Sequence, residues 1–135
     1  MVLSSSATHA LRIVAFLAAH ERDEAMQGRH IARRVRVPAD YLAKVMRRLA
    51  RAGVVTATRG VSGGYRLSRA PREIRLIEVV LPFEGERARP GCLLRPDRPC
   101  RDSGACSAHD AWRGVKTTYS RFLETTTVAD IQGSA

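Results

Sequence analysis

Three cysteines and one histidine lie close together in the last third of the chain, in the pattern C-x7-C-x5-C-x2-H. They are Cys92, Cys100, Cys106 and His109. Thiolate sulfur is a soft ligand that binds iron–sulfur clusters, zinc or copper(I), and an imidazole can complete the coordination shell. Zinc also accepts three cysteines and one histidine, although two of the spacings exceed those of a typical zinc hairpin. A thiol redox switch needs no metal, so the spacing leaves these chemistries open.

These residues fall in, or directly after, a segment that we expect to be a loop. Residues 82–106 are rich in Pro, Gly, Arg and Asp. So long an irregular segment in a small domain is usually functional or disordered. A loop can fold around a cluster and refold when the cluster changes.

A helix is expected over residues 107–126, with apolar residues at steps of four, three, four and three. They are Ala108, Trp112, Val115, Tyr119 and Phe122. This is coiled-coil spacing, and it favours pairing of two subunits over packing within one chain. Residues 127–135 are expected to form a polar tail.

A second group of chemically active side chains lies on a helix expected from Pro38 to Ala52. One face is apolar and points inward: Leu42, Val45, Met46 and Leu49. The other face carries Tyr41, Lys44, Arg47, Arg48 and Arg51. An apolar anchoring face opposite a basic one suits a helix that enters the major groove of DNA. A solvated surface helix has the same pattern.

Strand-forming residues follow at 54–58 and 65–67, and a glycine-rich turn joins them. This predicts a β-hairpin, in which Arg59 and Ser62 can contact the DNA backbone or minor groove. We expect two helices before the basic helix: one that starts after the capping residues Ser4 to Ser6, and a short one from about Gln27 to Arg34. This order predicts a winged helix-turn-helix.

The predicted fold is therefore mainly α, with a small hairpin wing and a long C-terminal dimerisation helix. A further helix should begin at Pro71 and be halted by Pro82. The expected division is a DNA-binding domain (1–81), the cysteine loop (82–106), the dimerisation helix (107–126) and the tail (127–135).

The net charge of +10 comes from 23 basic and 13 acidic residues. From Gly28 to Arg72 there are 12 basic residues and one acid, Asp40. A one-sided basic field of this kind favours double-stranded nucleic acid. Aromatic residues are only 5% of the chain, which argues against a stacking surface for single strands.

The remaining patterns bear on location and enzyme activity. No apolar run is long enough to span a membrane, and no signal peptide is recognisable, so we expect a cytoplasmic protein with reduced thiols. No nucleophile–base arrangement or pair of carboxylates indicates an enzyme.

Two segments resemble a known family. The run from Pro38 to Leu67, with Arg59-Gly60 and Gly63-Gly64-Tyr65, is similar to the winged-helix iron–sulfur transcription regulators that include IscR, NsrR and RirA. The segment from Cys92 to Trp112 resembles their cluster loop. The resemblance covers nearly the whole chain. It implies a homodimer on a pseudo-palindromic operator and a labile 2Fe-2S or 4Fe-4S cluster that reports iron, nitric oxide or redox state.

Carried over by position, the three cysteines match the cysteine ligands, and His109 matches the histidine that completes the shell in some members. Two positions depart from the family pattern. Thr8 stands where some relatives supply a carboxylate ligand from the partner subunit, which favours His109 as the fourth ligand, with His9 or a small ligand as fallbacks. Ala43 replaces an acidic residue that discriminates bases in some relatives, so no operator sequence can be transferred.

Overall fold

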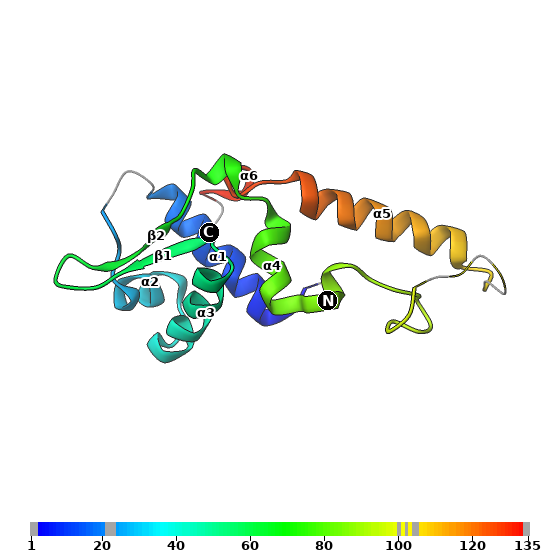
Figure 1. Cartoon of the computed structure of the whole chain (residues 1–135), viewed down its shortest axis with the longest axis horizontal. Coiled ribbons are helices and arrows are strands. Elements are labelled where there is room, and N and C mark those ends of the chain that lie inside the picture. The colour runs from blue at the N-terminus through cyan, green and yellow to red at the C-terminus, as the bar shows by residue number, and fades with distance from the viewer. Residues whose placement is uncertain (1–2, 21–23, 100, 102, 104–105, 134–135) are drawn as a thin grey trace.

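The computed structural model describes residues 3–20, 24–99, 101, 103 and 106–133 of the chain. Its elements are, in order, α1 (Ser5–Ala19), α2 (Gly28–Val35), α3 (Ala39–Arg51), β1 (Val55–Thr58), β2 (Gly64–Leu67), η1 (Pro71–Glu73), α4 (Leu76–Glu84), η2 (Gly85–Ala88), α5 (His109–Thr125) and α6 (Val128–Ile131). Figure 1 shows a helical body with the hairpin at one end, and α5 extends from the other side of this body as an arm.

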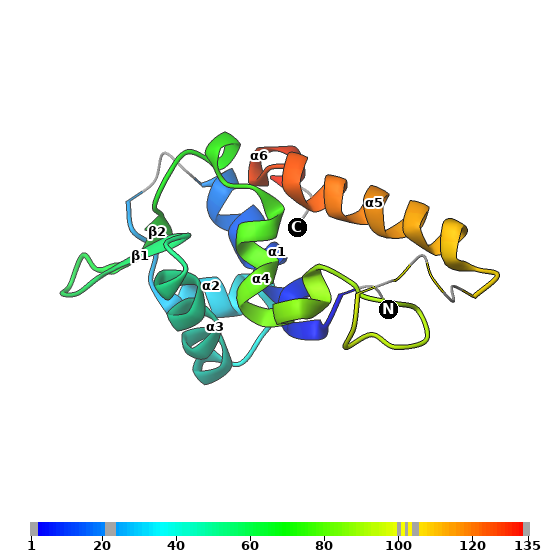
Figure 2. The same ribbon diagram turned by 45° about the vertical axis from the view of Figure 1, so that its right-hand side comes forward.

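Helix α1 lies in the middle of the helical body and contacts α2, α3, α4 and α6 (Figure 2). The side chain of Ser4 caps it by accepting a hydrogen bond from the backbone N–H of Ala7 at 3.2 Å. Ala7 and Ala10 are fully buried, and their small side chains let neighbouring helices approach closely. The expected capping of the first helix by serine is confirmed.

Helices α2 and α3 form the helix-turn-helix. Arg36 ends α2 in a left-handed conformation with φ of 60°, and Pro38 occupies the N-cap of α3. We expected this proline inside the helix, so the start of α3 is one residue later than predicted. The predicted inward face of α3 is confirmed, since all four of its apolar residues are buried.

The wing is an antiparallel hairpin in which Val55 pairs with Leu67 and Thr58 with Gly64. It is attached to the chain before α2 by two backbone hydrogen bonds: the N–H of Tyr65 donates to the carbonyl of Met26 at 2.8 Å, and that of Met26 to the carbonyl of Tyr65 at 2.9 Å. This contact fixes the wing beside the helix-turn-helix.

The prediction that Pro82 halts the fourth helix is wrong. Pro71 begins only a short 3-10 helix, and α4 then runs from Leu76 through Pro82 to Glu84. A proline inside a helix removes one hydrogen bond and costs about 3 kcal/mol. Burial of Val79 and Val80 in the core supports the helix through that position.

The prediction of a polar C-terminal tail is also wrong for the residues that form α6. The N–H of Leu76 donates to the carbonyl of Thr126, and the N–H of Val128 donates to the carbonyl of Ile74, both at 2.9 Å. Val128 is fully buried, and α6 packs against α1. One apolar side chain and two backbone hydrogen bonds order this segment.

Helix α5 is attached to the body near its C-terminal end, where Leu123 is fully buried. Its predicted apolar residues are not all covered: Val115 is 56% and Phe122 52% exposed. Among the described residues, no helix is both long and apolar enough to cross a membrane.

Candidate functional site

Two of the predicted cysteines and the histidine line one pocket of about 360 Å³ at the outer end of α5. Cys92 and Cys106 are partly exposed there, and His109 is buried. Cys100 lies outside the described residues, but its neighbours Pro99 and Arg101 line the same pocket. The structure therefore brings Cys92, Cys106 and His109 to one place.

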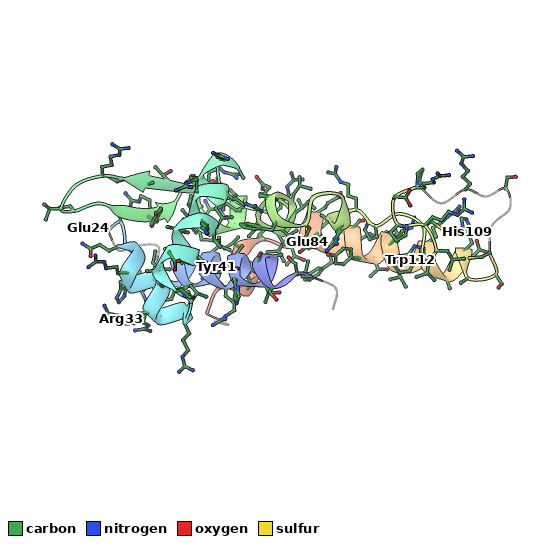
Figure 3. All side chains as sticks on the ribbon, turned by 90° about the horizontal axis from the view of Figure 1, so that it is seen from below. Glu24, Arg33, Tyr41, Glu84, His109 and Trp112 are labelled. Atoms are coloured by element: carbon green, nitrogen blue, oxygen red, sulfur yellow. The ribbon has the colours of Figure 1, made fainter. Side chains whose placement is uncertain are left out.

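Short contacts hold the loop against α5. The indole N–H of Trp112 donates to the carbonyl of Gly91 at 2.8 Å. The N–H of Cys92 donates to the carbonyl of Arg98 at 2.8 Å, which closes a loop of residues 92–98. Position 91 needs glycine, because a Cβ there would collide with the carbonyl groups of Pro96 and Arg98. Figure 3 shows His109 and Trp112 together at this end of the molecule.

The charge around the pocket is positive. Arg95, Arg98 and Arg101 line it beside the two thiols. Guanidinium groups favour a nearby negative charge, and a thiolate-bound metal centre carries one. The pocket thus combines soft sulfur donors with compensating cations.

His109 already has a hydrogen-bond partner that the sequence did not reveal. The guanidinium of Arg113 donates to its Nε2 at 2.8 Å. Nε2 must then offer its lone pair, which is also the pair that a metal would need. Arg113 lies four residues after His109 on α5, so their helical i, i+4 spacing was the available signal.

Within the described residues, no group of three His, Cys, Asp or Glu side chains is close enough to hold a metal ion. Cys100, the third predicted cysteine ligand, is not among the described residues. The predicted fallback, His9, lies elsewhere: its Nδ1 is 2.9 Å from the hydroxyl of Tyr41.

The basic face of α3 is exposed at four of its five predicted positions, namely Lys44, Arg47, Arg48 and Arg51. The fifth, Tyr41, is half-buried, and its hydroxyl joins α3 to His9 of α1. Arg59 and Ser62 are exposed in the turn of the wing. The basic helix face and the wing thus present exposed polar side chains as predicted, while Tyr41 has an internal contact as well.

Comparison with known proteins identifies this arrangement. The Rrf2 family, described as an iron-dependent transcriptional regulator, matches residues 3–133. The chain belongs to the Rrf2 family. The resemblance noted in the sequence is confirmed, and the chain is a transcriptional regulator and not an enzyme.

Relatives of this Rrf2 protein match over most of its length. An HTH-type transcriptional regulator of Aquifex aeolicus is 31% identical over 133 residues, which cover 97% of this chain and 91% of the relative. The HTH-type transcriptional repressor NsrR of Streptomyces coelicolor is 35% identical over 109 residues, or 81% of this chain and 72% of the relative.

Solved structures confirm the winged-helix fold of this Rrf2 chain. CymR, the global cysteine regulator of B. subtilis, matches with a TM-score of 0.83 at 22% identity and covers 98% of this chain and 97% of its own. IscR of T. potens gives 0.75 at 25%, covering 96% and 84%. The oxidized form of Staphylococcus aureus CymR gives 0.76 at 22%, covering 98% and 97%.

Proposed function

We propose that this Rrf2 protein is a cytoplasmic homodimer that binds a pseudo-palindromic DNA operator under the control of an iron–sulfur cluster. The cluster, 2Fe-2S or 4Fe-4S, would report iron, nitric oxide or redox state. The observation that carries the proposal is the shared pocket of Cys92, Cys106 and His109. The relatives named NsrR and IscR support it.

The proposed ligands are Cys92, Cys100, Cys106 and His109. A cluster on such ligands supplies chemistry that responds to oxidants, nitric oxide and iron supply. The donor set fits, because sulfur and imidazole are the ligands that such clusters take in proteins. Arg95 and Arg101 line the pocket and would balance the negative charge of the thiolates, whereas Arg98 already forms an ion pair with Asp97 at 3.5 Å.

His109 can serve as the fourth ligand through Nε2 only when the hydrogen bond from Arg113 is released. Arg113 would then turn away from His109 or bind another acceptor. We expect this exchange to make the histidine the most easily lost of the four ligands.

The DNA-binding part would be the predicted domain of residues 1–81, with α3 in the major groove. Lys44, Arg47, Arg48 and Arg51 would contact bases and phosphates there, and Tyr41 would lie at the edge of the groove. Arg59 and Ser62 of the wing would contact the backbone or minor groove. The loop of residues 82–106 and the helix of 107–126 would form the sensing and dimerising parts, and 127–135 the end of the chain.

The homodimer would form along α5. Val115 and Phe122 are both more than half exposed in the single chain, and a second α5 would cover them. A two-fold arrangement of two recognition helices matches a pseudo-palindromic operator.

Anaerobic native mass spectrometry of the intact protein tests the proposal, because dimer mass, iron and sulfide are read together. We expect a dimer with one cluster per chain in the wild type. Cys106→Ser should lose most of the iron, whereas the matched control Ser103→Ala, at a residue that lines the same pocket, should retain it. A protein that contains stoichiometric zinc, or that holds no metal, would contradict the cluster.

A thiol switch, or a zinc site, is the second candidate. It is favoured by the two thiols that share one pocket and by the structural match to CymR, which has been crystallised in an oxidized form. In this case mild oxidation of the metal-free protein should form an intramolecular disulfide and change DNA affinity. Cluster-dependent binding that is insensitive to such oxidation would exclude the switch.

A further inference from the structure

The last turn of α4 carries an aromatic ring that lies against the recognition helix. The guanidinium carbon of Arg48 on α3 is 5.7 Å from the centroid of the Phe83 ring. Phe83 is half-buried and packs against the core, whereas Arg48 is exposed. A cation at this distance over an aromatic face is attracted by the ring, so the contact restricts the arginine side chain.

The contact is with the aromatic ring, which is not a hydrogen-bond acceptor of the ordinary kind. Arginine carries five N–H donors, so an arginine held by the ring can still donate to a base edge or a phosphate. Among the described residues, no protein group forms a hydrogen bond or ion pair with the guanidinium of Arg48. Arg12, in contrast, donates to the carbonyl of Val35 at 2.9 Å, and Arg69 donates to Glu78 at 2.7 Å.

We propose that Phe83 is a positioning residue that holds Arg48 ready for operator DNA. The proposal rests on the proposed function, in which Arg48 contacts DNA. A long flexible side chain loses rotamer freedom when it binds, and holding it in place beforehand reduces that cost. Phe83 would therefore raise operator affinity without touching DNA.

Phe83 lies at the end of α4, between the DNA-binding part and the segment that carries the cysteines. The next residue, Glu84, accepts a hydrogen bond from the backbone N–H of Ser4 at 2.7 Å, which ties the end of α4 to the start of α1. Gly85 then leads through η2 towards Cys92. In Figure 3, Glu84 lies between Tyr41 and the end that carries His109 and Trp112. The end of α4 therefore lies between the recognition helix and the segment that leads to the cysteine loop.

A double-mutant cycle on the full-length protein tests this role. The probe is a genomic operator fragment selected by the wild-type protein, with a random duplex of equal length at the same salt. Phe83→Leu keeps an apolar side chain but removes the ring, and Phe83→Tyr keeps the ring. We expect Phe83→Leu to weaken operator binding about two- to fivefold, and Phe83→Tyr to bind as the wild type does. In the Arg48→Ala background, Phe83→Leu should have no further effect.

The urea midpoint of each variant separates a folding defect from a loss of positioning. Equal losses from Phe83→Leu with and without Arg48 would overturn the proposal, as would a gain in affinity. If Arg48→Ala alone binds the operator as tightly as the wild type, the positioning role falls, while operator binding by the protein stands. If the wild-type protein does not prefer any genomic fragment over random DNA, the proposed function falls, and the positioning role with it.

Discussion

In the part of the chain that the structure describes, Arg36 is the only residue other than glycine with a positive φ. It lies at the turn of the helix-turn-helix. Its φ of 60° places its Cβ near the following carbonyl, which costs about 1–2 kcal/mol for an L-residue. Its backbone N–H donates to the carbonyl of Ala32. The turn that sets the angle between α2 and α3 thus contains a strained residue.

Replacement of Arg36 by glycine should relieve that strain. We expect Arg36→Gly to raise the free energy of unfolding by up to about 1 kcal/mol, measured by urea denaturation. Arg33→Gly is the matched control, since Arg33 is exposed within α2, and glycine there should lower the same free energy by about 1 kcal/mol. The same sign for both substitutions would contradict the strain.

Glu78 is the residue whose ionisation contributes to stability at the start of α4. Its Oε2 accepts a hydrogen bond from the N–H of Arg75 at 2.8 Å, and its Oε1 accepts one from Arg69 at 2.7 Å. Burial raises the pKa of Glu78, but these hydrogen bonds and the two guanidinium charges outweigh it and leave the pKa below its usual value of 4.5. The ionised carboxylate is thus stabilised by folding.

Because the pKa is lower in the folded than in the unfolded chain, this stabilisation is present above the unfolded pKa and is lost as pH falls through the folded pKa. Glu78→Gln should lower the free energy of unfolding at pH 7 by less than about 1 kcal/mol, with the difference shrinking at acid pH. Urea denaturation between pH 7 and pH 3 measures it. Glu124→Gln, on the exposed surface of α5, is the control and should change the free energy of unfolding at pH 7 by less than about 0.5 kcal/mol.

At the scale of elements, the attachment of the wing depends on Gly64. Its φ is 146°, and a Cβ there would collide with the carbonyl of Met26. That carbonyl accepts the hydrogen bond from Tyr65. The hairpin can therefore lie against the chain before α2 only because this position has no side chain.

Gly64→Ala should separate the wing from the helix-turn-helix. We expect the free energy of unfolding to fall by about 1–3 kcal/mol, and operator affinity to fall with it, measured by urea denaturation and by DNA titration. Gly114→Ala is the control: it lies inside α5 with open space around its Cβ, and alanine there should be neutral or stabilising. If neither the free energy of unfolding nor the operator affinity falls in Gly64→Ala, the backbone at this position can shift at low cost.

The arm formed by α5 is the helix along which we propose that two chains pair. Its exposed apolar residues include Val115, at 56%, and Phe122, at 52%. Val115→Asp should shift the proposed dimer towards monomer, because a charge would be buried without a partner, and sedimentation over a concentration series measures the shift. Thr117→Asp, at an exposed polar position on the opposite side of the same helix, should leave the mass unchanged. An undiminished dimer in Val115→Asp would place the interface elsewhere.

For the whole molecule, the uneven charge decides how DNA binding responds to salt. Ten of the twelve basic side chains between Gly28 and Arg72 belong to the helix-turn-helix or the wing, and the other two, Arg69 and Arg72, lie directly after the wing. The cations of α5 lie on the arm instead. Each phosphate contact releases about one counterion, so the slope of log K against log salt counts such contacts.

Arg59→Gln should reduce the magnitude of that slope by about 1, measured by DNA titration between low and moderate salt. Arg121→Gln, which removes one exposed cation from α5, should leave the slope unchanged. An equal reduction in both variants would mean that the protein responds only to total charge.

Much of the fold could be read from local patterns. The serine cap of α1, the apolar face of α3 and the glycine-rich turn of the wing depend on neighbours within a few residues, and all were predicted. Pro82 and the C-terminal segment were misjudged for the opposite reason. Burial of Val79 and Val80 carries α4 through the proline, and Val128 orders α6 through contacts with residues about fifty positions earlier, such as Ile74.

The sequence by itself determined that the chain has a basic helix with a wing and that its cysteines lie in one stretch, because spacing along the chain is local. Only the tertiary structure decided which side chains meet: Tyr41 with His9, Arg48 with Phe83, and Glu84 with Ser4. These partners are 32 to 80 residues apart. Such contacts depend on how whole helices pack, and no periodicity records that packing.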